Sequence, residues 1–246
     1  MARGENIVRY AQAPPTRAAS AVYVTLAAQV LSLGALVVFE RSRGRQLALQ
    51  LASFGGRPQG AQAEAVVGAV TTFAVLMMLV AGTSVAAAAA YVTWLVRARQ
   101  VKDRSTPTGP VAAAWLIPVV NLVAPALLVH DVWRRAKPPA GRRGRWLALL
   151  AAWWLSWLAM LMLVTVRLPL DSSSDGLTGV GVLELSAAVV AALLCAATVR
   201  EVTRVQRLDV AGRLREAVAE TAAGPEVVTR LATRPAQGSA PFGHAG

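Results

Sequence analysis

The sequence predicts an all-α integral membrane protein, a helical bundle of four spanning helices plus one proline-broken segment that is re-entrant or kinked. Three observations predict this fold class. First, 55% of the 246 residues are hydrophobic and 15% are charged, whereas a soluble domain is about 25% charged. Second, four apolar runs reach the roughly 20 residues that a helix needs to cross the hydrocarbon core. Third, residues 113–133 are also apolar but carry two prolines.

The four uninterrupted runs lie at residues 20–39, within 65–96, at 146–166 and at 180–199. Each is too long and too uniformly apolar for the amphipathic surface helix of a soluble protein. The first run is not expected to be a cleaved signal peptide. It exceeds the usual apolar region of such a peptide, and ERSRGR follows it in place of a small-residue cleavage pattern.

Pro118, Asn121 and Pro125 interrupt the fifth apolar segment. Each proline removes a backbone donor and clashes with the preceding turn. Asn121 can hydrogen-bond the freed peptide groups and cap a second short helix, with Pro125 in its first turn. Residues 110–118 and 122–133 then form half-helices of roughly 13 to 18 Å, each too short to cross the core alone. One proline-kinked spanning helix is the alternative.

Lysines and arginines in the short loops predict the orientation. The loop at 134–145 is strongly basic and is expected in the cytoplasm, whereas the loop at 167–179 is acidic and is expected outside. Residues 97–104 are basic as well, so charge bias favours a segment that enters and leaves on the cytoplasmic side. The basic residues within 41–45 oppose this assignment, because they would then be external. Both termini are expected in the cytoplasm of a bacterial cell.

These assignments divide the chain into three parts. Residues 1–19 form a flexible cytoplasmic tail, 20–209 the transmembrane domain, and 210–246 a cytoplasmic tail that begins amphipathic and ends disordered. The net charge of +12 is clustered just outside the apolar runs. Positive charge in that position contacts anionic lipid headgroups at the cytoplasmic face, so nucleic acid is not the expected partner.

The sequence predicts no catalytic, cofactor or metal site. Cys195 is the single cysteine, so neither an intramolecular disulfide nor a cysteine metal site can form. No histidine and carboxylate spacing fits zinc, and no glycine-rich phosphate loop follows a strand. His130 and Asp131 point about 100° apart on a helix and are not a natural catalytic pair. His130 is expected beside Trp133 at the interface, and Asp131 beside a following arginine.

Glu184 is the sharpest single candidate, because carboxylates inside membrane helices are costly and often functional. It lies near the predicted external interface, so contact with water or headgroups is the alternative to a role in transport. Two further patterns concern packing. Tryptophans at the predicted cytoplasmic boundary suggest interfacial anchors: Trp94, Trp133 and Trp146. Small residues spaced four apart suggest an internal packing face or a dimer contact: Gly82, Ala86 and Ala90.

Three short motifs carry a resemblance: WLVRAR at Trp94–Arg99, WLIPVVNLVAP at Trp115–Pro125 and DVW at Asp131–Trp133. Over about residues 70–207 the chain resembles an uncharacterised family of actinobacterial multi-pass membrane proteins, a domain of unknown function. The resemblance implies no activity. The candidate functional or structural residues are therefore those of the motifs, with Glu184 added: Trp94, Arg97, Arg99, Trp115, Pro118, Asn121, Pro125, Asp131, Trp133 and Glu184.

Two functional classes follow from these features. The first is a non-enzymatic membrane component, such as a scaffold, an accessory subunit or a lipid-contacting module, with a membrane-protein partner or a second copy as further candidates. It is favoured because no catalytic groups converge. The alternative is a small solute or ion transporter or channel built around Pro118, Asn121 and Pro125, since discontinuous helices often mark solute sites. No substrate or oligomeric state can be assigned from the sequence.

Overall fold

The computed structural model describes residues 15–44, 46–47, 49, 61–101, 122–136, 138–170 and 180–222, and all regular structure in these ranges is helical. Four helices are long and apolar enough to cross a membrane, which confirms the predicted fold class: α2 (Thr16–Phe39), α4 (Ala61–Gln100), α8 (Arg143–Leu170) and α9 (Val182–Ala222). Three shorter elements accompany them: a π-helical turn at Glu40–Gly44, α7 (Ala124–Arg135) and a 3-10 turn at Ala140–Arg142.

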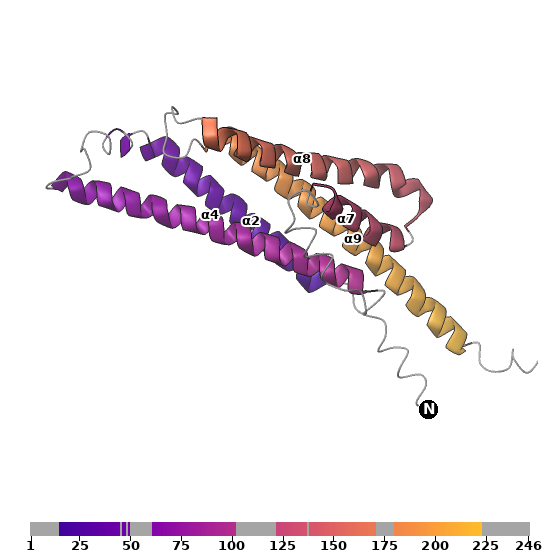
Figure 1. The fold of residues 1–246 in the computed structure, drawn as a ribbon. Coiled ribbons are helices and arrows are strands. Elements are labelled where there is room, and N and C mark those ends of the chain that lie inside the picture. Colours follow the sequence, from indigo (N-terminus) through magenta and orange to yellow (C-terminus); the bar gives the residue numbers. More distant parts are fainter. Residues whose placement is uncertain are drawn as a thin grey trace, which may run out of the picture.

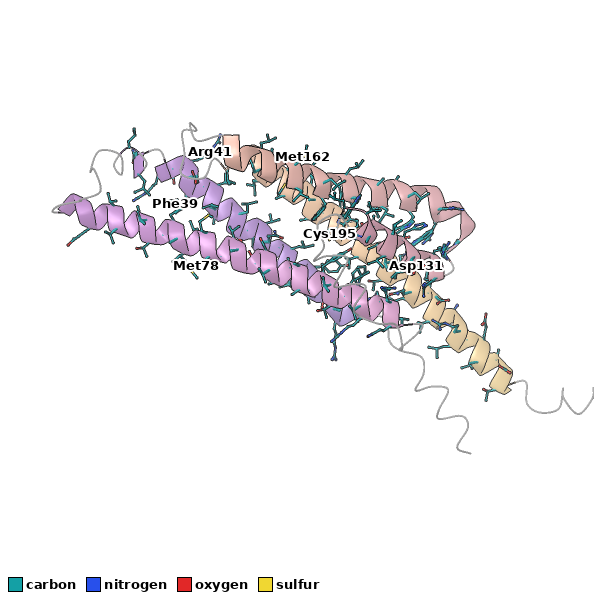
Figure 2. All side chains as sticks on the ribbon, in the orientation of Figure 1. Phe39, Arg41, Met78, Asp131, Met162 and Cys195 are labelled. Atoms are coloured by element: carbon teal, nitrogen blue, oxygen red, sulfur yellow. The ribbon has the colours of Figure 1, made fainter. Side chains whose placement is uncertain are left out.

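The long helices form an antiparallel bundle in which α2 packs against both α4 and α9, and α8 packs on α9 (Figure 1). We call one end of this bundle the basic end. It is formed by the start of α2, the end of α4, the end of α7, the start of α8 and residues 199–207 of α9. The opposite end is called the far end. Figure 2 shows Asp131 toward the basic end, Arg41 at the far end and Cys195 between them.

α9 is a single helix of 41 residues, about 62 Å long at 1.5 Å per residue. This is roughly twice the thickness of a hydrocarbon core. Figure 1 shows its C-terminal part running straight past the ends of the other helices. Residues 200–222 therefore continue the last apolar run without a break.

α7 is 12 residues long, about 18 Å, and too short to span. The backbone carbonyl of Leu122 accepts a hydrogen bond from Trp154 Nε1 at 3.2 Å. Trp154 lies 11 residues into α8, about 16 Å along its axis. Because the last turn of α7 contacts the first turn of α8 through Trp133 and Trp146, α7 runs from inside the bundle out to the basic end.

The segment between α4 and α8 therefore begins and finishes at the same end of the bundle (Figure 1). α7 corresponds to the predicted second half-helix and begins two residues later than expected. Pro125 is in its first turn, as predicted. The N-cap residue of α7 is Val123, which makes no side-chain cap hydrogen bond, and the predicted capping role of Asn121 stays a prediction. Trp115, Pro118, Asn121 and the predicted first half-helix lie outside the described residues.

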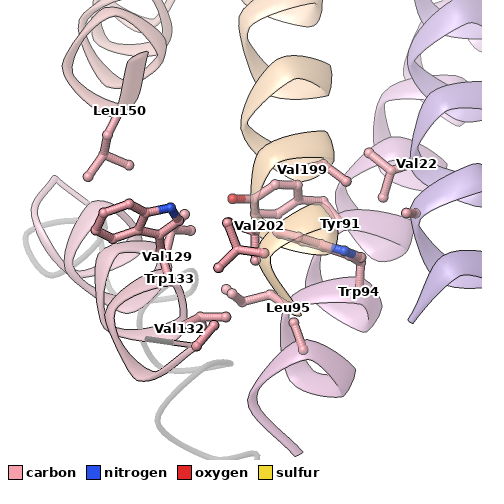
Figure 3. Packing of buried hydrophobic residues seen from close by; sticks show 14 of the residues in the cluster. Val22, Tyr91, Trp94, Leu95, Val129, Val132, Trp133, Leu150, Val199 and Val202 are labelled. Carbon is pink, nitrogen blue, oxygen red and sulfur yellow. The ribbon is translucent and has the colours of Figure 1, made fainter. Parts of the chain in front are cut away.

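The largest buried cluster gathers side chains of all five α-helices at the basic end, and Figure 3 shows its centre. Trp94 is fully buried, lies 5.5 Å from the ring of Tyr91, and donates from Nε1 to Thr203 Oγ1 at 3.3 Å. The rings of Trp133 and Trp146 stack 5.1 Å apart at 5°. Close packing of this kind holds membrane helices together, because lipid tails are as apolar as the side chains.

Two packing predictions are wrong. Trp94, Trp133 and Trp146 are each at most 3% exposed, so they are not interfacial anchors. Trp133 of α7 stacks on Trp146 of α8, and Trp94 contacts Thr203 of α9. The stripe of small residues is not an internal packing face, since Gly82 and Ala86 are exposed; its alternative role as a dimer contact stays a prediction. The α2-facing side of α4 is instead the neighbouring line of polar and small residues, where Ser84 accepts a hydrogen bond from Gln29 and Thr83 bonds Ser32.

Candidate functional site: an arginine-lined groove

A large groove lies at the basic end between α2 and α8, with α9 along its base. Its volume is about 1320 Å³. α2 contributes Thr16, Ala19, Ser20 and Tyr23, and the start of α8 contributes Arg145, Trp146 and Leu149. α9 contributes two kinds of residue in succession, apolar ones at 193–197 and mainly charged ones at 200–207. The groove is therefore apolar toward the middle of the bundle and basic at its end.

The charge of the groove comes from five arginines of the 3-10 turn, α8 and α9: Arg142, Arg145, Arg200, Arg204 and Arg207. Glu201 is the one carboxylate among the described residues that line it, so the net charge of these residues is five minus one, or +4. Glu201 pairs with Arg142 at 3.8 Å and links α9 to the turn before α8. This leaves four exposed guanidinium groups along the groove.

Helix geometry aligns three of these arginines. Arg200, Arg204 and Arg207 are spaced by four and three residues and so lie on one face of α9. The charges of Arg200 and Arg207 act on the hydroxyl of Tyr23, which faces them from α2. Guanidinium groups bind phosphate and carboxylate through paired hydrogen bonds. The groove can therefore bind an anionic group while its apolar side contacts hydrocarbon.

A second cavity of about 260 Å³, called the interior cavity because it lies nearer the middle of the bundle, is half-open to the surface between α2, α4, α8 and α9. Most of its lining is apolar. Its polar side chains come from four helices. Two of these side chains are bonded to each other, since Gln29 Nε2 donates to Ser84 Oγ at 3.1 Å. The others are Tyr91, Cys195 and the indole groups of Trp153 and Trp157. The cavity can accommodate hydrocarbon but offers few groups for recognising a polar solute.

A metal site does not appear in the described part of the chain, where no three histidine, cysteine or carboxylate side chains come together. His130 lies between two tryptophans. It stacks on Trp133 at 6.3 Å, and its Nδ1 accepts a hydrogen bond from Trp146 Nε1 at 3.2 Å. Asp131 points elsewhere and pairs with Arg135 at 2.8 Å and Arg134 at 3.8 Å. Both residues thus have structural contacts and form no catalytic pair with each other.

Of the remaining sequence candidates, Arg97 is exposed on α4. Arg99 lines a small cavity of about 20 Å³ at the junction of α4, α7 and α9, together with Gln206. Gln206 Nε2 donates to the carbonyl of Ala98 at 2.8 Å and so ties α9 to the end of α4. These residues hold the basic end together and do not line the groove.

Glu184 lies in the first turn of α9 at the far end. Its Oε2 accepts a hydrogen bond from the backbone N–H of Gly181 at 2.7 Å. A carboxylate three residues after the cap position that reaches back to the cap N–H is half of a capping box. Negative charge in the first turn also interacts favourably with the helix dipole. The geometry therefore gives Glu184 a role in starting α9.

Sequence reasoning did not identify the groove. Its signal was present in the four- and three-residue spacing of Arg200, Arg204 and Arg207 directly after an apolar run. That spacing indicates a basic helix face, but it does not reveal which helices border it. The approach of Tyr23 and Arg145 depends on the packing of α2 and α8.

The four long helices and the amphipathic groove define an α-helical multi-pass membrane protein. The chain belongs to the family described as "Domain of unknown function (DUF4328)", whose model matches residues 57–207. This confirms the resemblance to a domain of unknown function. The match covers α4, α7, α8 and most of α9, whereas α2 precedes it. No curated protein and no solved structure matches the chain.

Proposed function

We propose that this protein is a non-enzymatic component of a bacterial cell membrane that binds anionic lipid headgroups in the arginine-lined groove. The observation that carries the proposal is the groove itself, with a net charge of +4 among its described residues and an apolar side directed into the bundle. Basic pockets between membrane helices on the cytoplasmic side are typical sites for anionic headgroups.

The depth of the arginines supports a lipid as the ligand. The apolar part of α9 from Val182 to Val199 has 18 residues, about 27 Å, which is close to the thickness of the hydrocarbon core. Arg200, Arg204 and Arg207 follow directly and come to the level of the headgroups. A phosphate at that level can take paired hydrogen bonds from guanidinium groups without leaving the bilayer.

Transport of a small solute or ion is the second candidate, and the interior cavity is the feature that favours it. In this proposal the segment around Asn121 would supply the solute contacts, and Glu184, which accepts the cap hydrogen bond of Gly181, would be the titrating partner. Solute flux into proteoliposomes, compared between the wild type and Asn121→Ala, tests it. Flux that depends on Asn121 would favour transport.

Native mass spectrometry of the purified protein tests headgroup binding. The variant Arg200→Gln/Arg204→Gln should retain about tenfold less anionic phospholipid than the wild type, since two charge-assisted contacts are lost. Arg97→Gln/Arg134→Gln is the matched control, because it removes the same charge from exposed residues at the same end but outside the groove. Equal lipid loss in both variants would contradict a specific site and leave only general surface charge.

Cysteine labelling tests whether the basic end faces the cytoplasm. In a Cys195→Ala background, single cysteines replace Ser105, Ala140 and Ser42, the last being exposed at the far end. An impermeant thiol reagent should label Ser42→Cys in intact cells, and the other two only after permeabilisation. The reason is that the excess of arginine at one end favours the cytoplasmic side for that end. Labelling of Ser105→Cys alone in intact cells would overturn the re-entrant segment.

A further inference from the structure

The groove and the interior cavity follow one another along the same helix faces. On α8 the groove residues Trp146 and Leu149 continue into the cavity residues Trp153, Trp157 and Met160. These positions are three or four residues apart, which places them on one side of a helix. The two spaces are therefore adjacent along α8 and are not on opposite sides of it.

The same continuity holds on the other two helices. On α9, Arg200 and Ala196 of the groove are followed toward the bundle centre by Ala192 and Ala188 of the cavity, in steps of four. On α2, Ala19 and Tyr23 border the groove, and Leu26 and Val30 border the cavity. On each of the three helices, one continuous line of residues therefore runs from the charged groove to the apolar cavity.

The length of this path fits a lipid tail. From Arg200 to Ala188 there are 12 residues, about 18 Å along α9. The tails of one leaflet occupy half of a hydrocarbon core of about 30 Å, which is about 15 Å. A molecule whose phosphate lies among the arginines can therefore place its tail in the interior cavity. Small side chains at 188, 191, 192 and 196 leave the required space.

We infer that the groove and the interior cavity together form a single site for one anionic lipid, whose headgroup lies among Arg200, Arg204 and Arg207 and whose acyl chain lies between α2, α8 and α9. This inference rests on the proposed function, because the headgroup site is the groove. It adds that the lipid is an integral part of the bundle interior. An unfilled apolar space of 260 Å³ loses the packing contacts that hold membrane helices together, and the tail restores them.

Photo-crosslinking tests the inference directly. The protein is reconstituted in vesicles that contain an anionic phospholipid with a diazirine near the end of one acyl chain. After illumination, peptide mass spectrometry locates the adducts. We expect them on cavity residues such as Trp157, Met160 and Ala188. Adducts confined to the outward-facing residues Met78, Leu155 and Leu183 would overturn the inference, since those positions contact bulk lipid.

A cavity-filling variant gives the matched comparison. Ala192→Leu places three extra carbons in the path, whereas Ala86→Leu places the same carbons on the exposed face of α4. Adducts at Trp157 and Met160 should fall at least fivefold in Ala192→Leu and remain unchanged in Ala86→Leu. Equal adduct yields in the wild type and both variants would overturn the inference. If Ala192→Leu does not fold, the adduct positions in the wild type decide between the two outcomes.

Headgroup binding and tail insertion can fail separately. If Arg200→Gln/Arg204→Gln loses its anionic lipid but the wild-type adducts lie only on outward-facing residues, the groove binds headgroups and the inference is wrong. If cavity adducts form equally with a neutral diazirine lipid and in the arginine variant, the cavity holds a tail but the headgroup proposal is wrong. Cavity adducts that require both the anionic headgroup and the arginines support the complete site.

Discussion

The two ends of this bundle are built differently. At the basic end, side chains of α2, α4, α7, α8 and α9 meet in one buried cluster that includes Trp94, which is 0% exposed. At the far end, the ring pair found between α2 and α4 among the described residues is Phe39 and Phe73, 6.3 Å apart, beside buried aliphatic side chains such as Leu36. Large apolar residues of α4 face outward there, and Met78 is 76% exposed (Figure 2).

This difference shows at which end of the bundle helix association depends on contacts between the protein's own side chains. Outward-facing residues of a membrane helix contact lipid in the folded and the separated helices alike, so they contribute little to helix association. The buried aromatic side chains are different, because lipid cannot replace their contacts when one is removed. α7 accounts for the contrast, since it adds a fifth helix at the basic end only.

The largest loss of stability is expected when the side chain of Trp94 is truncated. Trp94→Ala removes a fully buried ring and its hydrogen bond to Thr203, and should lower the free energy of unfolding by about 3 to 5 kcal/mol. Phe73→Ala at the far end should cost less than about 1.5 kcal/mol, the value of one aromatic pair. Unfolding titrations in detergent measure both. Equal losses would show that the far end is packed as tightly as the basic end.

The sequence predicted the four spans because their signal is local: an apolar run of sufficient length is enough. It also predicted α7 and the placement of Pro125, since proline chemistry is a property of a few neighbouring residues. It failed for Trp94, Trp133 and Trp146. A tryptophan near the end of an apolar run suits an interfacial anchor, whereas the burial of these positions depends on contacts between helices, such as Trp133 with Trp146 and Trp94 with Thr203.

A loss of stability of intermediate size is expected when the polar contact between α2 and α4 is removed. Ser32 Oγ and Thr83 Oγ1 are hydrogen-bonded at 2.9 Å, and either can be the donor. Each hydroxyl is also placed to donate to a backbone carbonyl of its own helix, that of Gln29 or Leu79. Side-chain hydrogen bonds between membrane helices average about 0.6 kcal/mol. A double-mutant cycle of Ser32→Ala and Thr83→Val should give a coupling free energy of that size. A coupling above about 2 kcal/mol would make this polar contact a main support of the far half.

The groove shows a further limit of reasoning from sequence. Arg200, Arg204 and Arg207 lie on one helix face and can be recognised from their spacing, but Tyr23 and Arg145 join them through contacts distant in sequence. Glu184 shows the reverse case. A carboxylate in an apolar run suggests transport, yet the bond from Gly181 explains it by the local geometry of a helix start.

The smallest effect is expected for Asp131, although it belongs to the DVW motif. Its carboxylate pairs with Arg135 at 2.8 Å and Arg134 at 3.8 Å on the surface of α7, where both arginine side chains are more than half exposed. Ion pairs of this kind contribute about 0 to 1 kcal/mol, and salt screens them. Asp131→Asn should therefore change the free energy of unfolding by less than about 1 kcal/mol, and less still at high salt.

Comparison of Asp131 variants with Trp94→Ala tests which contacts stabilise the basic end. Asp131→Asn keeps the shape of the side chain and leaves the groove arginines in place, so anionic lipid retention in native mass spectrometry should match the wild type. Asp131→Leu is the companion variant that also removes hydrogen bonding. Loss of lipid in either variant would show that the charged surface of α7 supports the groove. Unfolding as ready as that of Trp94→Ala would show that packing of the buried aromatic cluster alone does not explain the stability of this end.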